Sequence, residues 1–180
     1  NESLSPLTRF VFRCCAIHGS ILGSSTDATV IFTHRDPVAV IQSAITMMAY
    51  ADRLRRTAID PEWLVTYWSD RVHRLLSSCV RDRDLVPADR GVDISFHQLN
   101  GNEITVLESL YDKAGVELTP GVRKRFARYL DDNPRGKHGN IRYDLRGHFG
   151  VTPEDLRSRF GFYFDRFDVR PEVQGGSART

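Results

Sequence analysis

One stretch of sequence decides the fold class of this chain, namely Thr29-Val-Ile-Phe-Thr-His-Arg-Asp-Pro-Val-Ala-Val-Ile-Gln-Ser43. Its first five residues are β-branched or aromatic, which predicts a buried strand. The pair Asp36-Pro37 then predicts the start of a helix. The aspartate can accept a backbone N–H of the first turn, and proline has a preset φ and no N–H to satisfy. A strand that leads directly into a helix is typical of α/β proteins with a parallel sheet.

The same signals recur on both sides of this stretch. Further strands are predicted over Phe10 to Cys15 and, by alternation, over Val92 to Phe96. Three more dipeptides predict helix starts by the same capping mechanism: Asp60-Pro61, Thr119-Pro120 and Thr152-Pro153. Since three strands are few for a sheet covered on both faces, we expect further strands upstream of Asn1.

Two helices can be described further from their apolar positions. The helix after Pro61 is expected to bury one stripe, made of Leu64, Trp68, Val72, Leu75 and Cys79. The aromatic residues Trp63, Tyr67 and Trp68 are expected to belong to the core. A shorter helix is expected to end at Gly115, because glycine tolerates the left-handed conformation of a C-terminal cap.

Composition restricts the class of protein. The chain has 180 residues, 41% apolar and 27% charged, which suits one globular domain. We expect that domain to cover residues 1–170 and residues 171–180 to form a flexible tail. The sequence has neither an apolar run long enough to span a bilayer nor a secretory signal, and its three cysteines have no CxxC spacing. These features favour a cytoplasmic protein.

Charge is distributed unevenly along the chain. The net charge of +2 argues against a nucleic-acid-binding protein. Between Pro120 and His148, however, eight Lys or Arg accompany only three acidic residues. This region either binds an anion or forms a solvated helix face with a basic loop. The six histidines lack the spacing of metal ligands, so no metal site is expected.

The connection between strand and helix has the features of an anion site. Backbone N–H groups and the positive end of the helix dipole meet at the start of the helix, and Arg35 adds a cation there. Ser43 lies two helical turns after Asp36, roughly 10 Å along the axis on the same face. Arg35 and Ser43 could share one phosphate. The alternative is that Arg35 forms an ion pair with Asp36 or with another acidic residue at the turn.

Residues Phe32 to Ser43 resemble the 3'-phosphate-binding segment of sulfotransferases that use 3'-phosphoadenosine 5'-phosphosulfate (PAPS), especially bacterial ones. The eight-residue step from arginine to serine matches. The resemblance implies that Arg35 and Ser43 hold the 3'-phosphate of the nucleotide.

A second segment, Asn133-Pro-Arg-Gly-Lys-His-Gly-Asn-Ile-Arg-Tyr143, is similar to one near the end of these bacterial enzymes. In better-known sulfotransferases a glycine-rich basic loop of the corresponding region closes on the 3'-phosphate. The resemblance therefore implies further cofactor-binding residues: Arg135, Gly136, Lys137, His138 and Gly139. The loop lacks the Gly-Asp-Trp-Lys continuation of the animal enzymes. The whole resemblance covers about Thr29 to Phe167.

The resemblance also implies a fold and a reaction. It implies a P-loop-like, three-layer α/β fold, in which a parallel sheet is flanked by helices, and transfer of a sulfuryl group from PAPS to a hydroxyl or amine. The acceptor would be a small molecule, or a lipid or glycan. The family's N-terminal strand, phosphosulfate loop and helix have no counterpart in this sequence, so the chain resembles the C-terminal part of such an enzyme.

The resemblance places His18 near the position of a catalytic base, although a histidine without a catalytic role fits that position too. Two other classes of function stay open. One is a non-catalytic nucleotide- or anion-binding module with the same fold. The other is a helical interaction domain whose basic end docks an acidic partner.

Overall fold

The computed structural model describes residues 10–12, 28–54, 58–137, 139, 141 and 143–174. We expected one domain over residues 1–170, and the contacts group the chain into two compact units. The sheet unit comprises Asn1–His34 and Asp82–Ile141, and the helical unit comprises Arg35–Arg81 and Arg142–Thr180. Each unit is described by itself.

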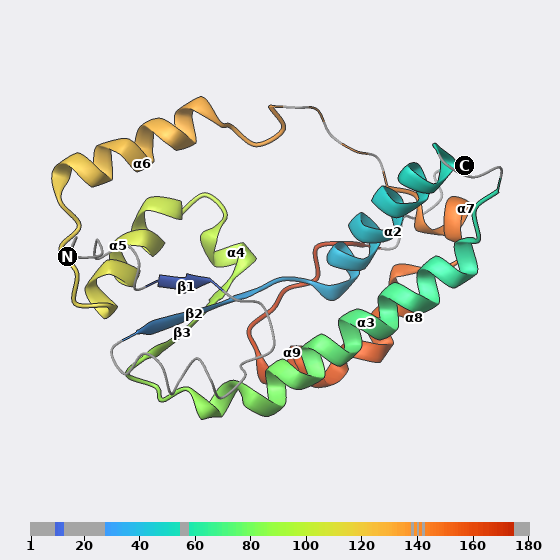
Figure 1. Ribbon diagram of the computed structural model, residues 1–180, viewed down its shortest axis with the longest axis horizontal. Coiled ribbons are helices and arrows are strands. Elements are labelled where there is room, and N and C mark those ends of the chain that lie inside the picture. Colours follow the sequence, from blue (N-terminus) through green and yellow to red (C-terminus); the bar gives the residue numbers. More distant parts are fainter. Residues whose placement is uncertain are drawn as a thin grey trace, which may run out of the picture. The chain divides into compact units, whose positions relative to one another are not determined.

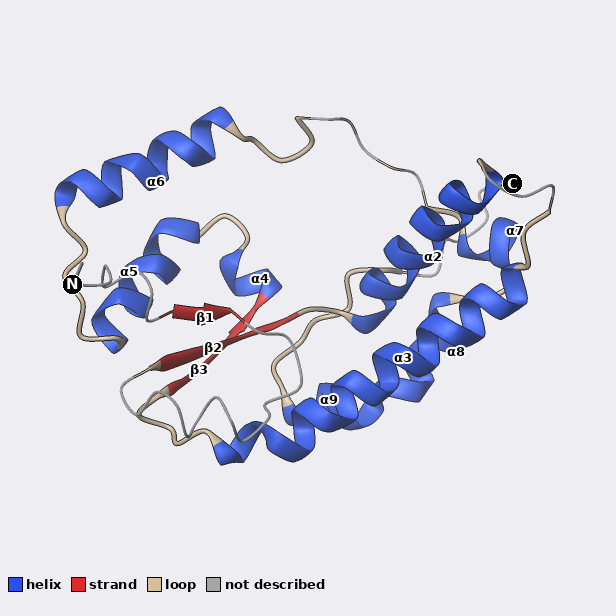
Figure 2. Ribbon diagram, viewed as in Figure 1, coloured by secondary structure: helices blue, strands red, loops and turns tan. Residues whose placement is uncertain are grey.

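The sheet unit contains a parallel sheet with the strand order β1-β2-β3 (Figure 2). The strands are β1 (Phe10–Phe12), β2 (Thr29–His34) and β3 (Gly91–Ser95). Because β2 is the central strand, all of its residues except Thr33 are buried. The three expected strands are thus confirmed, while Arg13 to Cys15 lie outside the described residues.

Apolar side chains cover both faces of β2. Ile31 packs with Ile94 and Leu110 on one face, and Val30 and Phe32 pack with Val86 on the other. Leu110 comes from α5 (Glu103–Lys113), which follows the short helix α4 (Phe96–Leu99) and contacts it (Figure 1).

The end of β3 differs from the expectation. Phe96 was expected to be the last residue of the strand, but it begins α4. The reason is a capping box, in which the Ser95 backbone N–H donates to the Gln98 side chain at 3.0 Å. A local cap thus overrides the apolar alternation.

Helix α6 (Pro120–Asp132) lies against α5. The rings of Tyr111 and Phe126 meet edge to face, with centroids 6.4 Å apart. Thr119 caps α6 by accepting the Val122 N–H, as expected. Gly115, just beyond α5, has a φ of 64°, so the predicted glycine C-cap is also confirmed.

The helical unit is built on two long helices, α2 (Pro37–Arg53) and α3 (Pro61–Asp82). Asp82, the last residue of α3, belongs to the sheet unit. Four short elements follow in the helical unit: α7 (Leu145–Phe149), α8 (Pro153–Arg157), the 3-10 helix η3 (Ser158–Phe160) and α9 (Gly161–Arg166). Asp36, Asp60 and Thr152 each accept a first-turn N–H, which confirms the remaining helix starts.

The buried face of α3 agrees with the expected stripe at Leu64, Val72 and Cys79 but departs from it elsewhere. Leu75 is 43% exposed, whereas Leu76, Val65 and Ser69 are buried. Trp63 and Tyr67 are not core residues either, since they are 54% and 38% exposed and stack on each other at 5.0 Å.

The C-terminal helices supply much of the core of the helical unit. Phe160 and Tyr163 are almost fully buried, and His73 of α3 lies 6.0 Å from the Phe160 ring. Among the described helices, none is both long and apolar enough to cross a bilayer.

Candidate functional site

The connection between β2 and α2 consists of Arg35 and Asp36. Asp36 is fully buried, and its Oδ1 accepts the Val38 N–H at 2.9 Å. The start of α2 is therefore capped by the chain's own carboxylate, and this carboxylate also stabilises the helix dipole.

Arg35 forms an ion pair with an acidic residue far along the chain. Its Nε donates to both carboxylate oxygens of Glu172, at 3.1 and 3.0 Å, and its Nη2 donates to Oε2 at 2.9 Å. The structure thus contains an ion pair of the kind left open above, although its partner is Glu172 and not Asp36. The Arg35 side chain nevertheless remains 48% exposed.

Glu172 belongs to the stretch that was expected to be a flexible tail. In the structure, the backbone N–H groups of Glu172 and Val173 donate to Asp36 Oδ2, at 2.8 and 3.4 Å. Arg157 donates to the Val173 carbonyl and lies 3.7 Å from Asp36. Residues 172 and 173 are therefore held at the start of α2, whereas residues 175–180 lie outside the described part.

Ser43 lies on α2 and is exposed. Arg35 and Ser43 belong to the same compact unit, and Ser43 lies on the helix that begins two residues after Arg35. The serine hydroxyl is therefore open to a ligand from solvent, two turns beyond the start of the helix.

Residues 133–141 of the second predicted segment belong to the sheet unit. Arg135 lies 3.4 Å from Glu103 and stacks over the Phe96 ring at 5.0 Å. The Lys137 ammonium donates to the Asp132 carbonyl at 2.6 Å. Gly136 and Gly139 have φ values of 76° and 88°, which explains why glycines stand there.

Two other predicted site residues, His138 of this loop and the candidate base His18, lie outside the described residues. Arg35 and Ser43 belong to one unit and the loop to the other, so the assignment of the loop to the nucleotide site stays a prediction.

One polar cluster was not anticipated. Asp93 of β3 accepts three hydrogen bonds from Arg83, at 2.7 to 3.0 Å, and lies 2.9 Å from His34 Nε2. Arg83 also stacks on the Phe32 ring at 4.5 Å. Burial raises the pKa of the Asp93 carboxyl, but the hydrogen bonds with His34 and Arg83 outweigh this effect and lower the pKa to about 2. The cluster ties β2 to β3 directly before Arg35.

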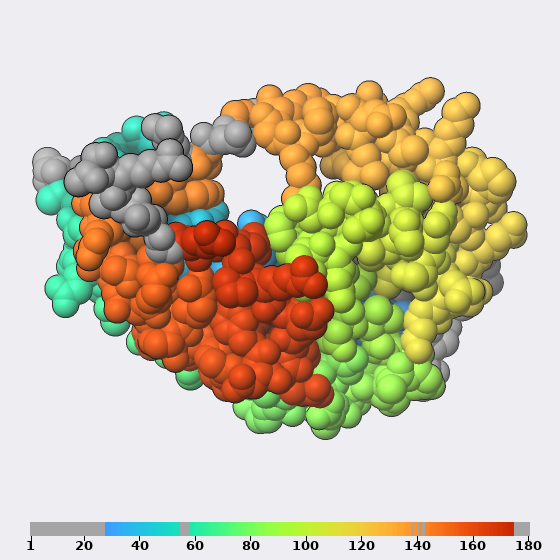
Figure 3. Space-filling model, turned by 180° about the vertical axis from the view of Figure 1, so that it is seen from behind, coloured from blue at the N-terminus to red at the C-terminus, as the bar shows by residue number. Residues whose placement is uncertain are grey.

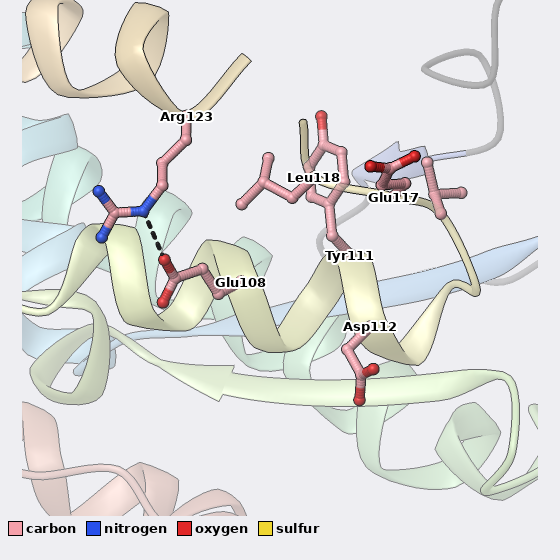
Figure 4. A pocket seen from close by; sticks show the side chains of 7 residues that line it. Glu108, Tyr111, Asp112, Glu117, Leu118 and Arg123 are labelled. Atoms are coloured by element: carbon pink, nitrogen blue, oxygen red, sulfur yellow. Dashed lines mark hydrogen bonds and ion pairs between the residues drawn. The ribbon is translucent and has the colours of Figure 1, made fainter. Parts of the chain in front are cut away.

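A pocket of about 290 Å³ lies in the sheet unit (Figure 4). It is lined by Glu108, Tyr111, Asp112, Val116, Glu117, Leu118 and Arg123. Its cation, Arg123, already pairs with Glu108 at 2.7 Å. Three carboxylates around one paired arginine do not suit a phosphorylated ligand, and none of the predicted site residues lines this pocket.

Metal ligands do not cluster in the described part of the chain, where His, Cys, Asp and Glu form no group of three able to hold a metal ion.

Comparisons with known proteins identify the family. Residues 20–120 match a family model described as the sulfotransferase family, so the chain belongs to this family. A comparison with curated proteins gave no match.

The structure is similar to solved bacterial sulfotransferases. STF9 from Mycobacterium avium has a TM-score of 0.72 and 22% identity, over 86% of this chain and 40% of that one. STF1 from Mycobacterium tuberculosis H37Rv has a TM-score of 0.63 and 19% identity, and the match covers 79% of this chain and 36% of STF1. These likenesses confirm the expected α/β fold with its parallel sheet. The chain spans about two fifths of the length of these structures.

Proposed function

We propose that this chain carries the adenosine 3',5'-bisphosphate-binding part of a sulfotransferase that uses PAPS. The sulfuryl group goes to a hydroxyl or amine of a small molecule, or of a lipid or glycan. A bond forms between the acceptor atom and sulfur while the bond from sulfur to the 5'-phosphate oxygen breaks. Adenosine 3',5'-bisphosphate leaves with the electron pair, and a base takes the acceptor proton.

The observation that carries this proposal is the bidentate grip of Arg35 on the Glu172 carboxylate. Phosphate oxygens accept from a guanidinium fork in the same geometry as carboxylate oxygens. Arg35 therefore has an orientation suited to an oxyanion, in a chain that belongs to the sulfotransferase family. The exposed Ser43, on the helix that begins two residues after Arg35, supplies a second donor.

In this proposal the residues of the chain position the nucleotide. Arg35 and Ser43 hold the 3'-phosphate. The loop from Arg135 to Gly139 adds positive charge, and its glycines allow the backbone to come close to the phosphate. Holding the nucleotide aligns its sulfuryl group with the acceptor, and the cations stabilise the charge that develops on the leaving phosphate. His18 is the candidate for the base.

Isothermal titration calorimetry tests the phosphate assignment. Arg35→Ala should weaken binding of adenosine 3',5'-bisphosphate about ten- to a hundredfold, because a charge-assisted contact is worth ~1.5–3 kcal/mol. The matched control is Arg159→Ala, since Arg159 is also half-exposed and paired with an acidic residue, Asp70, in the same unit. Equal affinities of wild type and Arg35→Ala would refute the assignment.

Two further measurements test recognition of the 3'-phosphate and sulfuryl transfer separately. Adenosine 5'-phosphate lacks the 3'-phosphate and should bind at least about tenfold more weakly than the bisphosphate. Transfer of labelled sulfate from PAPS to an acceptor would identify an enzyme. Tight bisphosphate binding without transfer would favour the non-catalytic module instead.

A further inference from the structure

The Glu172 carboxylate lies where an anionic ligand of Arg35 is expected. It accepts two N–H groups of the guanidinium at 2.9 to 3.1 Å, and the Asp36 backbone N–H points to its Oε1 at 3.4 Å. An arginine fork together with a backbone amide at the start of a long helix is a donor set that proteins use for phosphate. Here the protein supplies its own oxyanion to these donors.

We propose that Glu172 competes with the nucleotide phosphate for Arg35 and thereby sets the affinity of the site. The carboxylate must leave the guanidinium before a phosphate can accept the same N–H groups. This inference rests on the proposed function, because it assigns a regulator to the same phosphate site.

Electrostatics favours competition over assistance. A carboxylate that holds Arg35 in one rotamer reduces the side-chain entropy that the arginine loses when the ligand binds. At a half-exposed site this effect strengthens binding only slightly. A carboxylate within about 5 Å of a doubly charged phosphate repels it, and this repulsion is larger than the entropy gain. Removing the charge of Glu172 should therefore tighten binding.

The backbone of Glu172 is held independently of its side chain. Its N–H donates to the fully buried Asp36, and Arg157 donates to the carbonyl of the next residue, Val173. Figure 3 shows the C-terminal described residues, in red, at the surface of the molecule. The side chain, 23% exposed, can thus rotate away or be replaced while the segment keeps its position.

The test is calorimetric titration of the 180-residue protein with adenosine 3',5'-bisphosphate. Glu172→Gln, which keeps the shape but removes the charge, should bind about tenfold more tightly than wild type. Glu154→Gln is the matched control, because Glu154 is an exposed acid 4.0 Å from Arg157 in the same unit. Its affinity should equal that of wild type. Equal or weaker binding by Glu172→Gln would overturn the proposal.

A double variant distinguishes competition from a general structural effect. If Glu172 acts mainly through Arg35, most of the gain should disappear in Arg35→Ala/Glu172→Gln compared with Arg35→Ala alone, and only the smaller part due to direct repulsion should remain. A gain as large without Arg35 as with it would overturn the proposal. Melting temperatures establish that each variant is folded, and Glu172→Ala serves as a second variant with the same expected gain.

A parallel titration with inorganic pyrophosphate separates this inference from the proposed function. In one outcome, Glu172→Gln binds pyrophosphate more tightly than wild type and this gain requires Arg35, but neither wild type nor any variant binds the bisphosphate. The competition between Glu172 and a phosphate is then supported, and the assignment of the site to the nucleotide fails. If wild type binds the bisphosphate through Arg35 but Glu172→Gln changes neither affinity, the nucleotide assignment stands and the competition fails.

Discussion

At the residue scale, the properties of Arg35 come from both neighbouring and distant residues. Its position after a buried strand and before a proline-started helix is encoded within ten residues of sequence. Its partner Glu172 lies 137 residues away, and local patterning carries no information about it. The ion pair leaves the Arg35 side chain half-exposed, so it is compatible with a role of this arginine in binding a ligand.

Ser43→Ala tests the second donor of the proposed phosphate site. A neutral hydroxyl bond is worth about 1 kcal/mol, so this substitution should weaken bisphosphate binding about fivefold, less than Arg35→Ala does. The control is Ser78→Ala, which removes a hydroxyl from α3 of the same unit. Calorimetric titration measures both affinities. A Ser43→Ala variant that binds as wild type does would remove Ser43 from the site.

The site could be predicted from sequence only where its residues are neighbours in the chain. Arg35 and Ser43 follow from a strand, a cap and a helix period. The Asp93 cluster was missed because its members come from three separate segments, Arg83 and His34 among them. The alternation of polar and apolar residues in β3 marks Asp93 as a polar position but does not identify its partners.

At the element scale, capping residues were better predictors than apolar stripes. All four proline-marked helix starts are confirmed, since each capping side chain accepts a backbone N–H of the first turn. A cap needs only a few adjacent residues, so its signal is local. Which face of α3 is buried depends instead on the elements that pack on it. Successive residues of a helix point in directions about 100° apart, so an expected stripe that is off by one residue lies on a different face. This is why Leu76, and not Leu75, is buried.

Asp60→Ala tests the contribution of one such cap to stability. The Asp60 side chain accepts the Trp63 N–H at 2.9 Å at the start of α3. Its loss leaves that donor without the capping oxygen, so the free energy of unfolding should fall by about 1 kcal/mol. Urea unfolding followed by circular dichroism measures the change.

The control for this prediction is Asp60→Asn, which keeps an accepting oxygen. It should retain most of the stability of wild type, because asparagine is as good an N-cap as aspartate. If asparagine and alanine destabilise the protein equally, the contribution of Asp60 comes from its charge and not from the capping hydrogen bond.

At the scale of the whole molecule, the parallel sheet was predictable but the division into two units was not. Strand and helix signals alternate along the sequence, which is sufficient for the α/β class. The helical unit joins residues 35–81 to residues 142–180, and this grouping depends on long-range contacts such as those of Asp36 with Glu172 and Val173. Such contacts have no periodicity in the sequence.

The whole molecule should lose stability on acidification. The carboxyls with a lowered pKa lie in both units: Asp70, Asp93, Glu103 and Asp155. A carboxyl with a lowered folded-state pKa stabilises the protein above its unfolded pKa, and this contribution disappears as the pH falls through the folded value. Asp155 is exposed, and Asp70 and Glu103 pair with arginines that are themselves half-exposed, so these three contributions are small. Asp93 pairs with the buried Arg83 and should therefore contribute most.

Asp93→Asn isolates this contribution. At pH 6 the variant should be about 1–2 kcal/mol less stable than wild type, because the buried Arg83 loses a charged partner whose side chain, 38% exposed, is partly screened by solvent. Since the pKa of Asp93 falls from 3.8 to about 2 on folding, the difference between the two proteins should persist above pH 4 and narrow from pH 4 to pH 2. Urea midpoints at several pH values measure it, with the exposed Asp89→Asn as the control. A difference that is as large at pH 2 as at pH 6 would mean that Asp93 stabilises the sheet through packing and neutral hydrogen bonds, and not through its charge.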